Sequence, residues 1–208
     1  MFTDYTEAAS QLAAALSRYR GSRPIVFSVA RGSFRIGQYV ARSLEAEFDV
    51  ALVSVFGAMY NVNYAVGAID ESGASYVPGA VFPPEAPNAY LERERASLLD
   101  HLHQRRSLYT PHRSRLNAAE RIVIVVDDAI LTGMTMIAAL QGLRADTPDR
   151  LIGAVPVATR AGLEATRPYA DELVCLSTPA GFRDVRQAYS THPAISDAEI
   201  LSNLASKP

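Results

Sequence analysis

The sequence contains almost no cysteine and almost no excess charge. Cys175 is the single cysteine among 208 residues, and one thiol supports neither a disulfide framework nor a cysteine-based zinc site. It lies in the apolar run Leu173–Leu176, so we expect a buried structural thiol. The formal net charge is −2, which excludes the strongly basic surface of a protein that binds nucleic acid or anionic membranes.

Long hydrophobic runs are missing as well. No apolar segment is long enough to span a bilayer, and the acidic N-terminal residues lack the pattern of a secretion signal. We therefore expect a cytoplasmic protein without a membrane partner. Internal repeats and low-complexity tracts are also absent. A chain of 208 residues suffices for one good-sized α/β domain, so the sequence predicts a single domain over residues 1–208.

The segment Ile122–Val126 is the most informative part of what is present. Every residue in it is β-branched, which indicates a short strand buried on both faces of a parallel sheet. Two acids, Asp127 and Asp128, follow directly, where we expect the strand to reach solvent. Carboxylates accept hydrogen bonds from neighbouring hydroxyl groups, so this pair suits a ribose.

A short loop after the two acids has the composition of an anion site. It contains Thr132, Gly133 and Thr135, and an apolar-periodic helix starts near Met136. The backbone N–H groups of such a loop and the helix N-terminus favour a phosphate, and the two threonines add hydroxyl donors. We expect Gly133 to let the backbone approach the ligand, so that a side chain at this position would occupy the phosphate site.

Other interpretations of this segment are weaker. Asp, Gly and Thr are common in any surface turn after a strand, but two acids followed by the full T-G-x-T spacing are not. A Walker-type phosphate loop would need a lysine after Gly133 and a different glycine spacing. A phospho-accepting aspartate of a receiver domain would leave the Thr-Gly loop unexplained.

A second loop with anion-binding composition follows another apolar segment, Pro24–Val29. In Ala30–Ser33, Gly32 exposes backbone N–H groups and Arg31 offers a planar fork to phosphate oxygens. In mostly parallel sheets, ligands bind beyond the strand C-termini, where the strand order reverses. If Pro24–Val29 and Ile122–Val126 are neighbours at that point, the two loops face each other across one crevice.

Hydrophobic periodicity predicts strands alternating with helices, which is typical of a three-layer α/β fold with a mostly parallel sheet. Residues 57–87 interrupt this pattern with a predicted hairpin, Tyr64–Ile69 with Ala74–Val77. The further predicted strands are Phe48–Phe56, Leu151–Val157 and Glu172–Leu176. The predicted helices are one capped by Thr3 and closed by Gly21, one bearing Ile36, Val40 and Leu44, a long one over Asn88–Tyr109, a short one over Ala161–Arg167, and a last one capped by Ser196 with Glu199.

Residues 123–135, VIVVDDAILTGMT, resemble the phosphoribosyl-pyrophosphate (PRPP) signature of type I phosphoribosyltransferases. Across nearly the whole chain, the sequence is similar to a bacterial and archaeal branch of stand-alone predicted phosphoribosyltransferases. The motifs that carry this second resemblance are Arg31-Gly32-Ser33, Gly67-Ala68-Ile69, Ala154–Ala158, Pro179 with Phe182, Tyr189, and Ser196–Glu199. The resemblance implies the type I phosphoribosyltransferase fold, with residues 57–87 as an inserted hairpin that forms a lid.

The resemblance also implies transfer of phosphoribose from PRPP to an unidentified nitrogenous acceptor, with Mg²⁺ as cofactor and pyrophosphate as product. Asp128 and Arg31 are the expected catalytic residues, and Mg²⁺ arrives with PRPP rather than in a fixed protein site. The ribose 5-phosphate would contact Asp127, Asp128, Ala129, Ile130, Leu131, Thr132, Gly133, Met134 and Thr135. The pyrophosphate would contact Ala30, Arg31, Gly32, Ser33 and Arg35. The acceptor would enter beneath residues 57–87 and the segment Pro179–Tyr189. The sequence leaves open whether the chain forms a homodimer.

The sequence departs from this branch near the expected pyrophosphate site. Ser33 replaces a second glycine, and Ser54 and Val55 stand where the branch has Arg and Lys. The loss of basic residues weakens the case for transfer more than the case for binding. The alternative is therefore a non-catalytic PRPP or nucleotide sensor on the same fold. If the chain is a transferase, Arg35 is the residue expected to compensate.

Other polar and aromatic candidates favour structural roles. His101 and His103 lie two apart on a predicted helix, so they point to different sides and make a poor metal pair. His112 and His192 are isolated, and no histidine is placed by sequence to activate a serine or threonine nucleophile. Packing is favoured over base stacking for Tyr60, Tyr64, Tyr76, Phe82, Phe182 and Tyr189.

Overall fold

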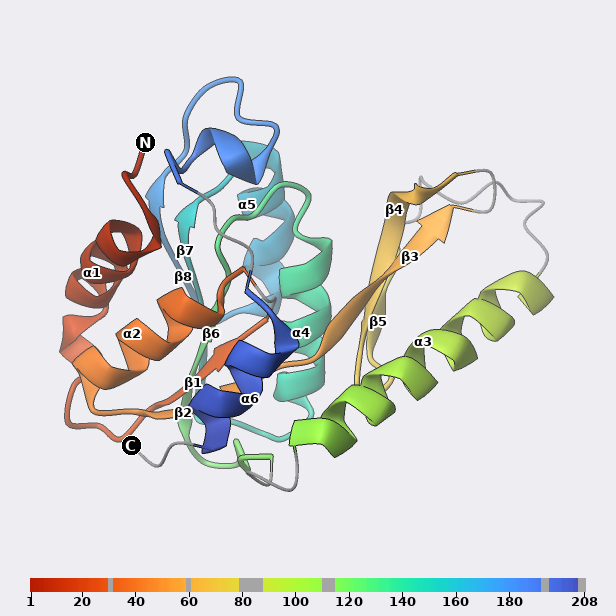
Figure 1. Ribbon diagram of the computed structural model, residues 1–208, viewed down its shortest axis with the longest axis horizontal. Helices are drawn as coiled ribbons and strands as arrows, with labels where there is room; N and C mark the ends of the chain where they lie inside the picture. Colours follow the sequence, from red (N-terminus) through yellow and green to blue (C-terminus); the bar gives the residue numbers. More distant parts are fainter. Residues whose placement is uncertain (30–31, 59–60, 79–87, 110–114, 192–194, 206–208) are drawn as a thin grey trace.

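The computed structural model describes residues 1–29, 32–58, 61–78, 88–109, 115–191 and 195–205. These residues form a five-stranded parallel sheet in the order β2-β1-β6-β7-β8 and a three-stranded antiparallel sheet in the order β3-β4-β5 (Figure 1). The strands are β1 (Ile25–Ser28), β2 (Glu47–Val50), β3 (Val53–Ala58), β4 (Asn61–Asp70), β5 (Ser75–Tyr76), β6 (Ile122–Val126), β7 (Arg150–Val157) and β8 (Glu172–Ser177). The α-helices are α1 (Tyr5–Ala15), α2 (Phe34–Leu44), α3 (Asn88–Tyr109), α4 (Met134–Arg144), α5 (Arg160–Thr166) and α6 (Asp197–Ala205), and the 3₁₀ helices are η1 (Ser17–Tyr19), η2 (Arg167–Tyr169) and η3 (Val185–Gln187).

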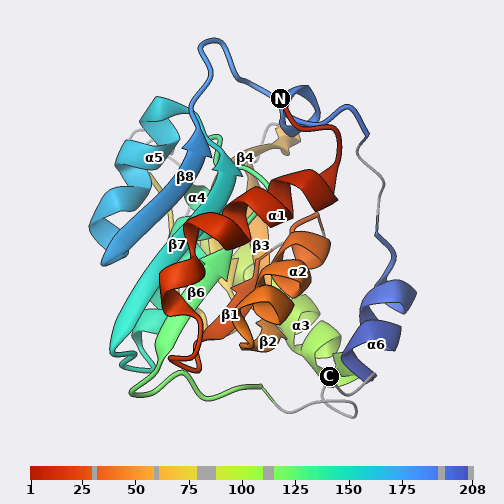
Figure 2. The same cartoon turned by 90° about the vertical axis from the view of Figure 1, so that its left-hand side faces the viewer.

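Helices cover both faces of the five-stranded sheet, as the alternating sequence pattern predicts. α1 and α2 lie side by side on one face, and α4 and α5 lie on the other (Figures 1 and 2). The apolar stripe of α2 explains its docking, because Ile36, Val40 and Leu44 recur at helical spacing and are all fully buried. The predicted three-layer α/β fold with a parallel sheet is therefore confirmed.

The predicted hairpin forms as β4 and β5, and β3 adds the third strand of the small sheet beside the main body (Figure 1). α4 packs between the two sheets, where Ala68 of β4 clusters with Met134 and Ala138 of α4. α3 packs against β3 and β4, and its Leu102 and Tyr109 are buried. The hairpin thus shares a hydrophobic contact with the helix that follows the two acids.

One predicted strand, Phe48–Phe56, is wrong because the chain changes sheets within it. β2 belongs to the parallel sheet and β3 to the antiparallel sheet. The N–H of Ala51 still donates to Ser28 O at 2.9 Å, whereas Leu52 O accepts from Glu71 N–H of the hairpin at 3.1 Å. The apolar pattern runs through both strands because each is buried by a different neighbour, and periodicity does not distinguish the neighbours.

Two smaller predictions are also wrong. Asp4 rather than Thr3 is the N-cap of the first helix, since its carboxylate accepts from Thr6 N–H at 2.8 Å and Glu7 N–H at 2.9 Å. Cys175 is only partly buried, because β8 is an edge strand of its sheet. In the ranges that the structure describes, no helix is both long and apolar enough to cross a membrane.

The predicted neighbourhood of the two loops is confirmed by the strand order. β1 and β6 pair in parallel, with Ser28 opposite Val126. The chain continues from β1 to β2 on one side and from β6 to β7 on the other, so the strand order reverses between them. Both loops therefore leave the sheet at the edge where ligands bind in folds of this kind.

Candidate functional site

Gly32 brings the two loops into direct contact across the crevice. A Cβ atom on this residue would overlap Asp128 Oδ2 and would lie 3.4 Å from the hydroxyl of Tyr5. Only glycine therefore fits between the first loop and the acid pair. Ala30 and Arg31, which were expected to contact pyrophosphate, lie outside the residues that the structure describes.

Asp127 is buried rather than placed at solvent as the sequence suggested. Only 5% of its surface is exposed, and its Oδ1 accepts from the N–H of Asp128 at 2.9 Å. Its own N–H donates to Ala154 O of β7 at 3.2 Å. Burial, followed by the negative charge of Asp128, raises the pKa of the Asp127 carboxyl well above its ordinary value.

Asp128 is the acid that borders the crevice, and two tyrosines hold it. The hydroxyl of Tyr5 donates to Asp128 Oδ2 at 3.3 Å. The hydroxyl of Tyr189 donates to the backbone carbonyl of Asp128 at 2.6 Å. Burial, and then the charge of Asp128, raises the pKa of both phenols, so both remain donors at neutral pH. The two adjacent acids therefore occupy different environments.

The loop after the acids is tied to β7 on one side and open on the other. Ile130 N–H donates to Val157 O at 3.0 Å, and Thr159 N–H donates to Ile130 O at 2.8 Å. Among the described residues, no acceptor hydrogen-bonds to the N–H groups of Leu131, Thr132 or Gly133. These donors and the N-terminus of α4 lie together where the sequence predicts an anion site.

The side chains of this loop divide between core and crevice. Met134 is buried in the cluster between α4 and the hairpin, so it supports the loop rather than presenting a side chain to a ligand. Thr132 is exposed and Thr135 is partly exposed, which leaves both hydroxyls accessible. The loop thus offers backbone N–H groups and two hydroxyls to one anion.

Gly133 is required for a different reason from the one the sequence suggested. Its φ of +88° lies in the left-handed region, and a Cβ atom would lie 2.7 Å from Thr166 Oγ1 and 3.1 Å from Gly162 O. The missing side chain therefore points at α5, and the expectation that it would fill the phosphate position is wrong. α5 buttresses the loop from behind.

The start of α2 carries the remaining predicted pyrophosphate residues. Ser33 is fully buried at the N-cap of α2. The guanidinium group of Arg35 is paired with Glu199 of α6, with Nε 2.9 Å from Oε1 and Nη2 3.0 Å from Oε2. Arg35 is thus held by the C-terminal helix in this structure. Ser54 and Val55, the positions at which the sequence resemblance implies basic residues, lie on β3, and Val55 is exposed.

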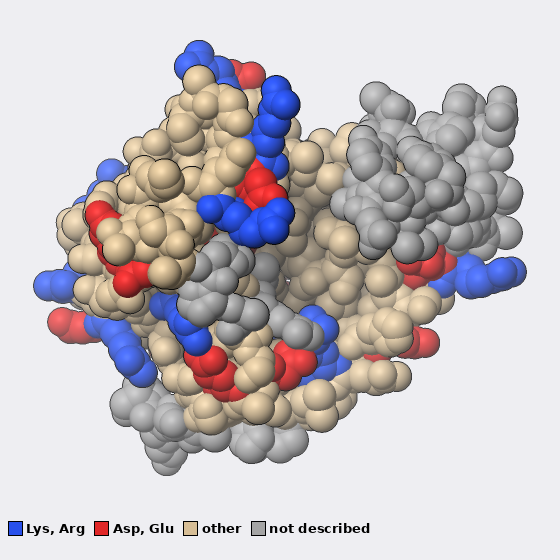
Figure 3. Space-filling view, turned by 45° about the horizontal axis from the view of Figure 1, so that its top comes forward, with Lys and Arg blue, Asp and Glu red and all other residues tan. Residues whose placement is uncertain are grey.

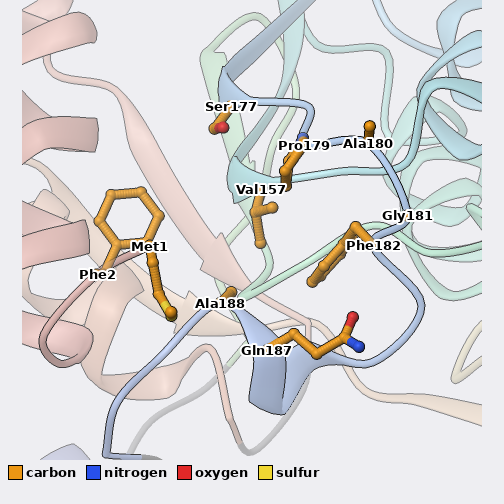
Figure 4. Close-up of a pocket in the computed structure, with 10 residues that line it drawn as sticks. All are labelled: Met1, Phe2, Val157, Ser177, Pro179, Ala180, Gly181, Phe182, Gln187 and Ala188. Atoms are coloured by element: carbon orange, nitrogen blue, oxygen red, sulfur yellow. The ribbon is translucent and has the colours of Figure 1, made fainter.

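A cavity of about 370 Å³ lies beyond the carboxyl ends of β7 and β8. Figure 4 shows Val157 and Phe182 pointing into it, while Gln187 and Ala188 border it near η3. Ala188 precedes Tyr189, so the cavity wall continues into the residue that holds Asp128. The other lining residues are Met1, Phe2, Ser177, Pro179, Ala180 and Gly181. Viewed from this end, the surface is hollowed near its centre, and acidic and basic side chains lie on the rim (Figure 3).

Several residues of this region have no local signal in the sequence. Tyr5 and Glu199 lie near opposite chain ends, and Thr159, Gly162 and Thr166 belong to a short helix with no recognisable motif. His101 and His103 are exposed, and His103 hydrogen-bonds to Glu71 O at 3.0 Å, a contact with the hairpin. His112, His192, Tyr60 and Phe82 lie outside the described residues, as do the side chains of Tyr64 and Leu91.

Comparison with known proteins places this geometry in a family. Residues 2–187 match the family model described as "Phosphoribosyl transferase domain". Relatives from Mycobacterium tuberculosis strains CDC 1551 and H37Rv, each named "Putative phosphoribosyl transferase", are 35% identical over 209 residues. The match covers 98% of this chain and 46% of each relative, so the chain spans about half the length of the curated relatives it matches.

Two solved structures have the same fold and differ in how similar they are to this chain. The crystal structure of TT1426 from Thermus thermophilus has a TM-score of 0.82 and 34% identity, over 98% of this chain and 97% of that chain. A hypothetical protein from Neisseria gonorrhoeae, solved with bound ppGpp, has a TM-score of 0.55 and 13% identity, over 99% of this chain and 94% of its own. The second similarity extends to the fold alone.

Proposed function

Since this chain belongs to the phosphoribosyl transferase domain family, we propose that it transfers the phosphoribosyl group of PRPP to a nitrogenous acceptor and releases pyrophosphate. The supporting observation is the contact of Gly32 with Asp128 beside the open N–H groups of Leu131–Gly133. One crevice thereby combines a phosphate site, a hydroxyl clamp and a second backbone loop. A phosphorylated ribose that carries a second anion matches this combination.

Each group has a separate part in binding. The N–H groups of Leu131–Gly133 and the hydroxyls of Thr132 and Thr135 hold the 5-phosphate at the positive end of α4. Asp127 and Asp128 accept hydrogen bonds from the ribose hydroxyls. The backbone at Gly32, with Arg31 beside it in the sequence, meets the pyrophosphate.

Magnesium fits this donor set as an ion that arrives with the substrate. Among the described residues, no three His, Cys, Asp or Glu side chains are grouped as a metal site, whereas the partly exposed Asp128 supplies a hard oxygen ligand beside the phosphate loop. Mg²⁺ keeps several waters and binds through one or two carboxylates and substrate phosphates. When bound, it neutralises negative charge on the pyrophosphate.

The transfer step asks the protein for positioning and charge stabilisation. The bond from ribose C1 to pyrophosphate breaks with both electrons leaving on pyrophosphate, and the acceptor nitrogen supplies the electron pair of the new bond to C1. Positive charge develops on the ribose ring in between, next to the carboxylate of Asp128. Fixed charges and dipoles that match this distribution lower the barrier without a protein nucleophile.

The acceptor binds in the cavity near Phe182 and Ala188. Its walls are mainly apolar, and Tyr189 connects them to Asp128, so an acceptor placed there is close to the ribose. Part of the predicted lid, residues 59–60 and 79–87, lies outside the described residues. A largely apolar site with a few polar groups suits a planar nitrogenous ring.

A pyrophosphate-release assay tests this proposal. We expect the full chain with Mg²⁺ and PRPP to release pyrophosphate faster in the presence of one member of a panel of purine, pyrimidine and pyridine bases. Asp128→Asn should lose most of this rate. Asp171→Asn, which alters a surface carboxylate paired with Arg144, is the matched control and should keep it.

The rival function is a PRPP or nucleotide sensor without turnover. It is favoured by Arg35, whose guanidinium is occupied by Glu199, and by the uncharged residues Ser54 and Val55. Tight binding of Mg-PRPP without pyrophosphate release for any base would support the sensor and contradict the transferase. Ser54→Arg with Val55→Lys provides a second readout, since added basic charge should raise the rate of a transferase and leave a sensor inactive.

A further inference from the structure

Two tyrosines from opposite ends of the chain meet at Asp128. Tyr5 is the first residue of α1, and Tyr189 follows η3 near the C-terminal end. Their rings pack edge to face with centroids 4.7 Å apart, and 4% of Tyr5 and 3% of Tyr189 are exposed. Both hydroxyls reach the same residue, one its carboxylate and the other its carbonyl.

The pair is held rigidly by its backbone. Phe2 and Tyr189 form a parallel bridge, in which Phe2 N–H donates to Ala188 O at 2.8 Å and Ser190 N–H donates to Phe2 O at 3.0 Å. The Asp4 cap then fixes the start of α1 and thus the position of Tyr5. Two phenols anchored in this way reach Asp128 with little freedom to move. Folding has already fixed their conformation, so ligand binding pays no further entropy cost to order these hydrogen bonds.

We propose that Tyr5 and Tyr189 are positioning residues for ribose 5-phosphate recognition, with Tyr5 orienting the carboxylate that binds the ribose and Tyr189 orienting the phosphate loop. This inference rests on the proposed function, because it assigns Asp128 to a phosphorylated ribose. Neither tyrosine needs to touch the substrate. Each acts through the atom of Asp128 to which it donates.

The part of Tyr5 follows from its acceptor. Asp128 Oδ2 accepts the hydrogen bond from the Tyr5 hydroxyl and lies against Gly32, so these two neighbours set the orientation of the carboxylate. Loss of the phenol hydroxyl lets the Asp128 carboxylate rotate between rotamers. Ribose binding must then fix one rotamer, and this entropy cost lowers the affinity for ribose. The 5-phosphate contacts, which come from other residues, are unaffected.

The part of Tyr189 follows from the geometry of a peptide plane. The carbonyl of Asp128 and the N–H of Ala129 belong to one trans peptide, so they point in opposite directions. A hydroxyl that holds the carbonyl at 2.6 Å therefore sets the direction of the Ala129 N–H and the course of the backbone that leads, two residues later, to the open N–H of Leu131. Loss of this hydroxyl alters the loop itself, and phosphate and ribose 5-phosphate lose affinity together.

Calorimetry with ribose 5-phosphate and with inorganic phosphate separates the two effects. In the wild-type chain, ribose 5-phosphate should bind more tightly than phosphate. Tyr5→Phe should reduce this preference roughly three- to tenfold, the effect of one lost hydrogen bond, with phosphate affinity retained. Tyr189→Phe should weaken both ligands by a similar factor and keep the preference.

Tyr19→Phe is the matched control. Tyr19 is also buried, and its hydroxyl also donates to a carboxylate, Glu172 Oε2 at 2.6 Å, but Glu172 lies at the start of β8, away from the crevice. It should lose stability as the other variants do and keep both affinities. A lower folded fraction weakens both ligands by the same factor, so the preference for ribose 5-phosphate remains a valid readout in a destabilised variant, and thermal unfolding of each variant shows whether it is folded at the temperature of the titration.

The outcomes separate this inference from the function on which it rests. A wild-type chain that binds ribose 5-phosphate no better than phosphate would overturn both. A clear wild-type preference that is unchanged in Tyr5→Phe, together with unchanged affinity for both ligands in Tyr189→Phe, would overturn the positioning role alone. If Tyr5→Phe does not fold, Tyr189→Phe still decides, because equal weakening of both ligands in a variant that is folded at the temperature of the titration is expected from a displaced loop.

Discussion

The guanidinium group of Arg35 forks onto the carboxylate of Glu199, and this pair links the start of α2 to α6 across 164 residues of sequence. Gln38 and Asn203 add a second link between the same helices at 3.1 Å. The predicted pyrophosphate residues include two basic ones, Arg31 and Arg35, and the structure describes Arg35. Its pairing with Glu199 therefore competes with any part it has in binding pyrophosphate.

Glu199→Gln should release Arg35 and tighten the binding of Mg-PRPP. Arg35 and Glu199 are 38% and 36% exposed, and pairs of this kind contribute at most about 1 kcal/mol, so the gain should be about fivefold or less. Arg35→Ala should reduce the rate of transfer about tenfold or more. Calorimetry and initial rates measure these effects. Glu47→Gln, which breaks the surface pair with Arg121, should change neither, and unchanged affinity in both site variants would remove Arg35 from the pyrophosphate site.

Gly133→Ala should destabilise the protein more than the same change at another left-handed glycine. The φ of Gly133 is +88°, and a Cβ added there would clash with Thr166 Oγ1. The variant therefore has backbone strain of about 1–2 kcal/mol and, in addition, a steric clash. Gly21, with a φ of +80° and no atom within 4 Å of a Cβ, is the control for strain alone.

Adding Thr166→Ala to Gly133→Ala should recover part of the extra loss, because it removes the atom that the new Cβ meets. Urea denaturation gives the free energies of unfolding, and calorimetry gives the affinity for Mg-PRPP. Equal losses in Gly133→Ala and Gly21→Ala would contradict the packing of the loop against α5.

Asp127→Asn should make the fold relatively more stable as the pH rises. The pKa of Asp127 is raised in the folded state, mainly by burial, so its contribution to stability is fully present below the unfolded pKa of about 3.9 and is lost as the pH rises through the folded value. Asparagine has no charge to bury. The difference in free energy of unfolding between variant and wild type should therefore grow as the pH rises above about 4, while ribose affinity falls.

Asp171→Asn provides the opposite sign. The hydrogen bond from Arg144 lowers the pKa of Asp171, so this carboxylate contributes stability above its unfolded pKa and loses it as the pH falls. The variant should be less stable than wild type near neutral pH and should approach it in acid. The same trend in both variants would refute the buried, charge-coupled environment of Asp127.

Arg106→Met should loosen the hairpin. Arg106 donates to both oxygens of Glu71 at 2.6 Å and to Val50 O at 2.6 Å, and its side chain is 13% exposed. Breaking a buried pair typically costs about 3–5 kcal/mol. Thermal unfolding measures this loss, and amide hydrogen exchange in the turn that joins β4 and β5 should accelerate. Arg93→Met on the exposed face of the same helix should stay within about 0.5 kcal/mol of wild type.

The strands, helices and ligand loops were predictable where the signal is local. The all-β-branched segment Ile122–Val126 is the buried strand β6, and the hairpin and Asn88–Tyr109 form as expected. Phe48–Phe56 was mispredicted because an apolar strand looks the same in either sheet. Gly133 was recognised as essential, but its backbone direction, and hence the neighbour that excludes a side chain, depends on where α5 packs.

The sequence by itself determined the order of strands and helices, the strand–acid–loop segment and the family to which the chain belongs. These features depend mainly on residues that are close to one another in the sequence. Only the tertiary structure decided that Asp127 is buried while Asp128 faces the crevice, that Tyr5 reaches Asp128 across 123 residues, and that Glu199 holds Arg35. The physical reason is that hydrophobic periodicity specifies which face of an element is buried, whereas a hydrogen-bond partner depends on which distant element covers that face.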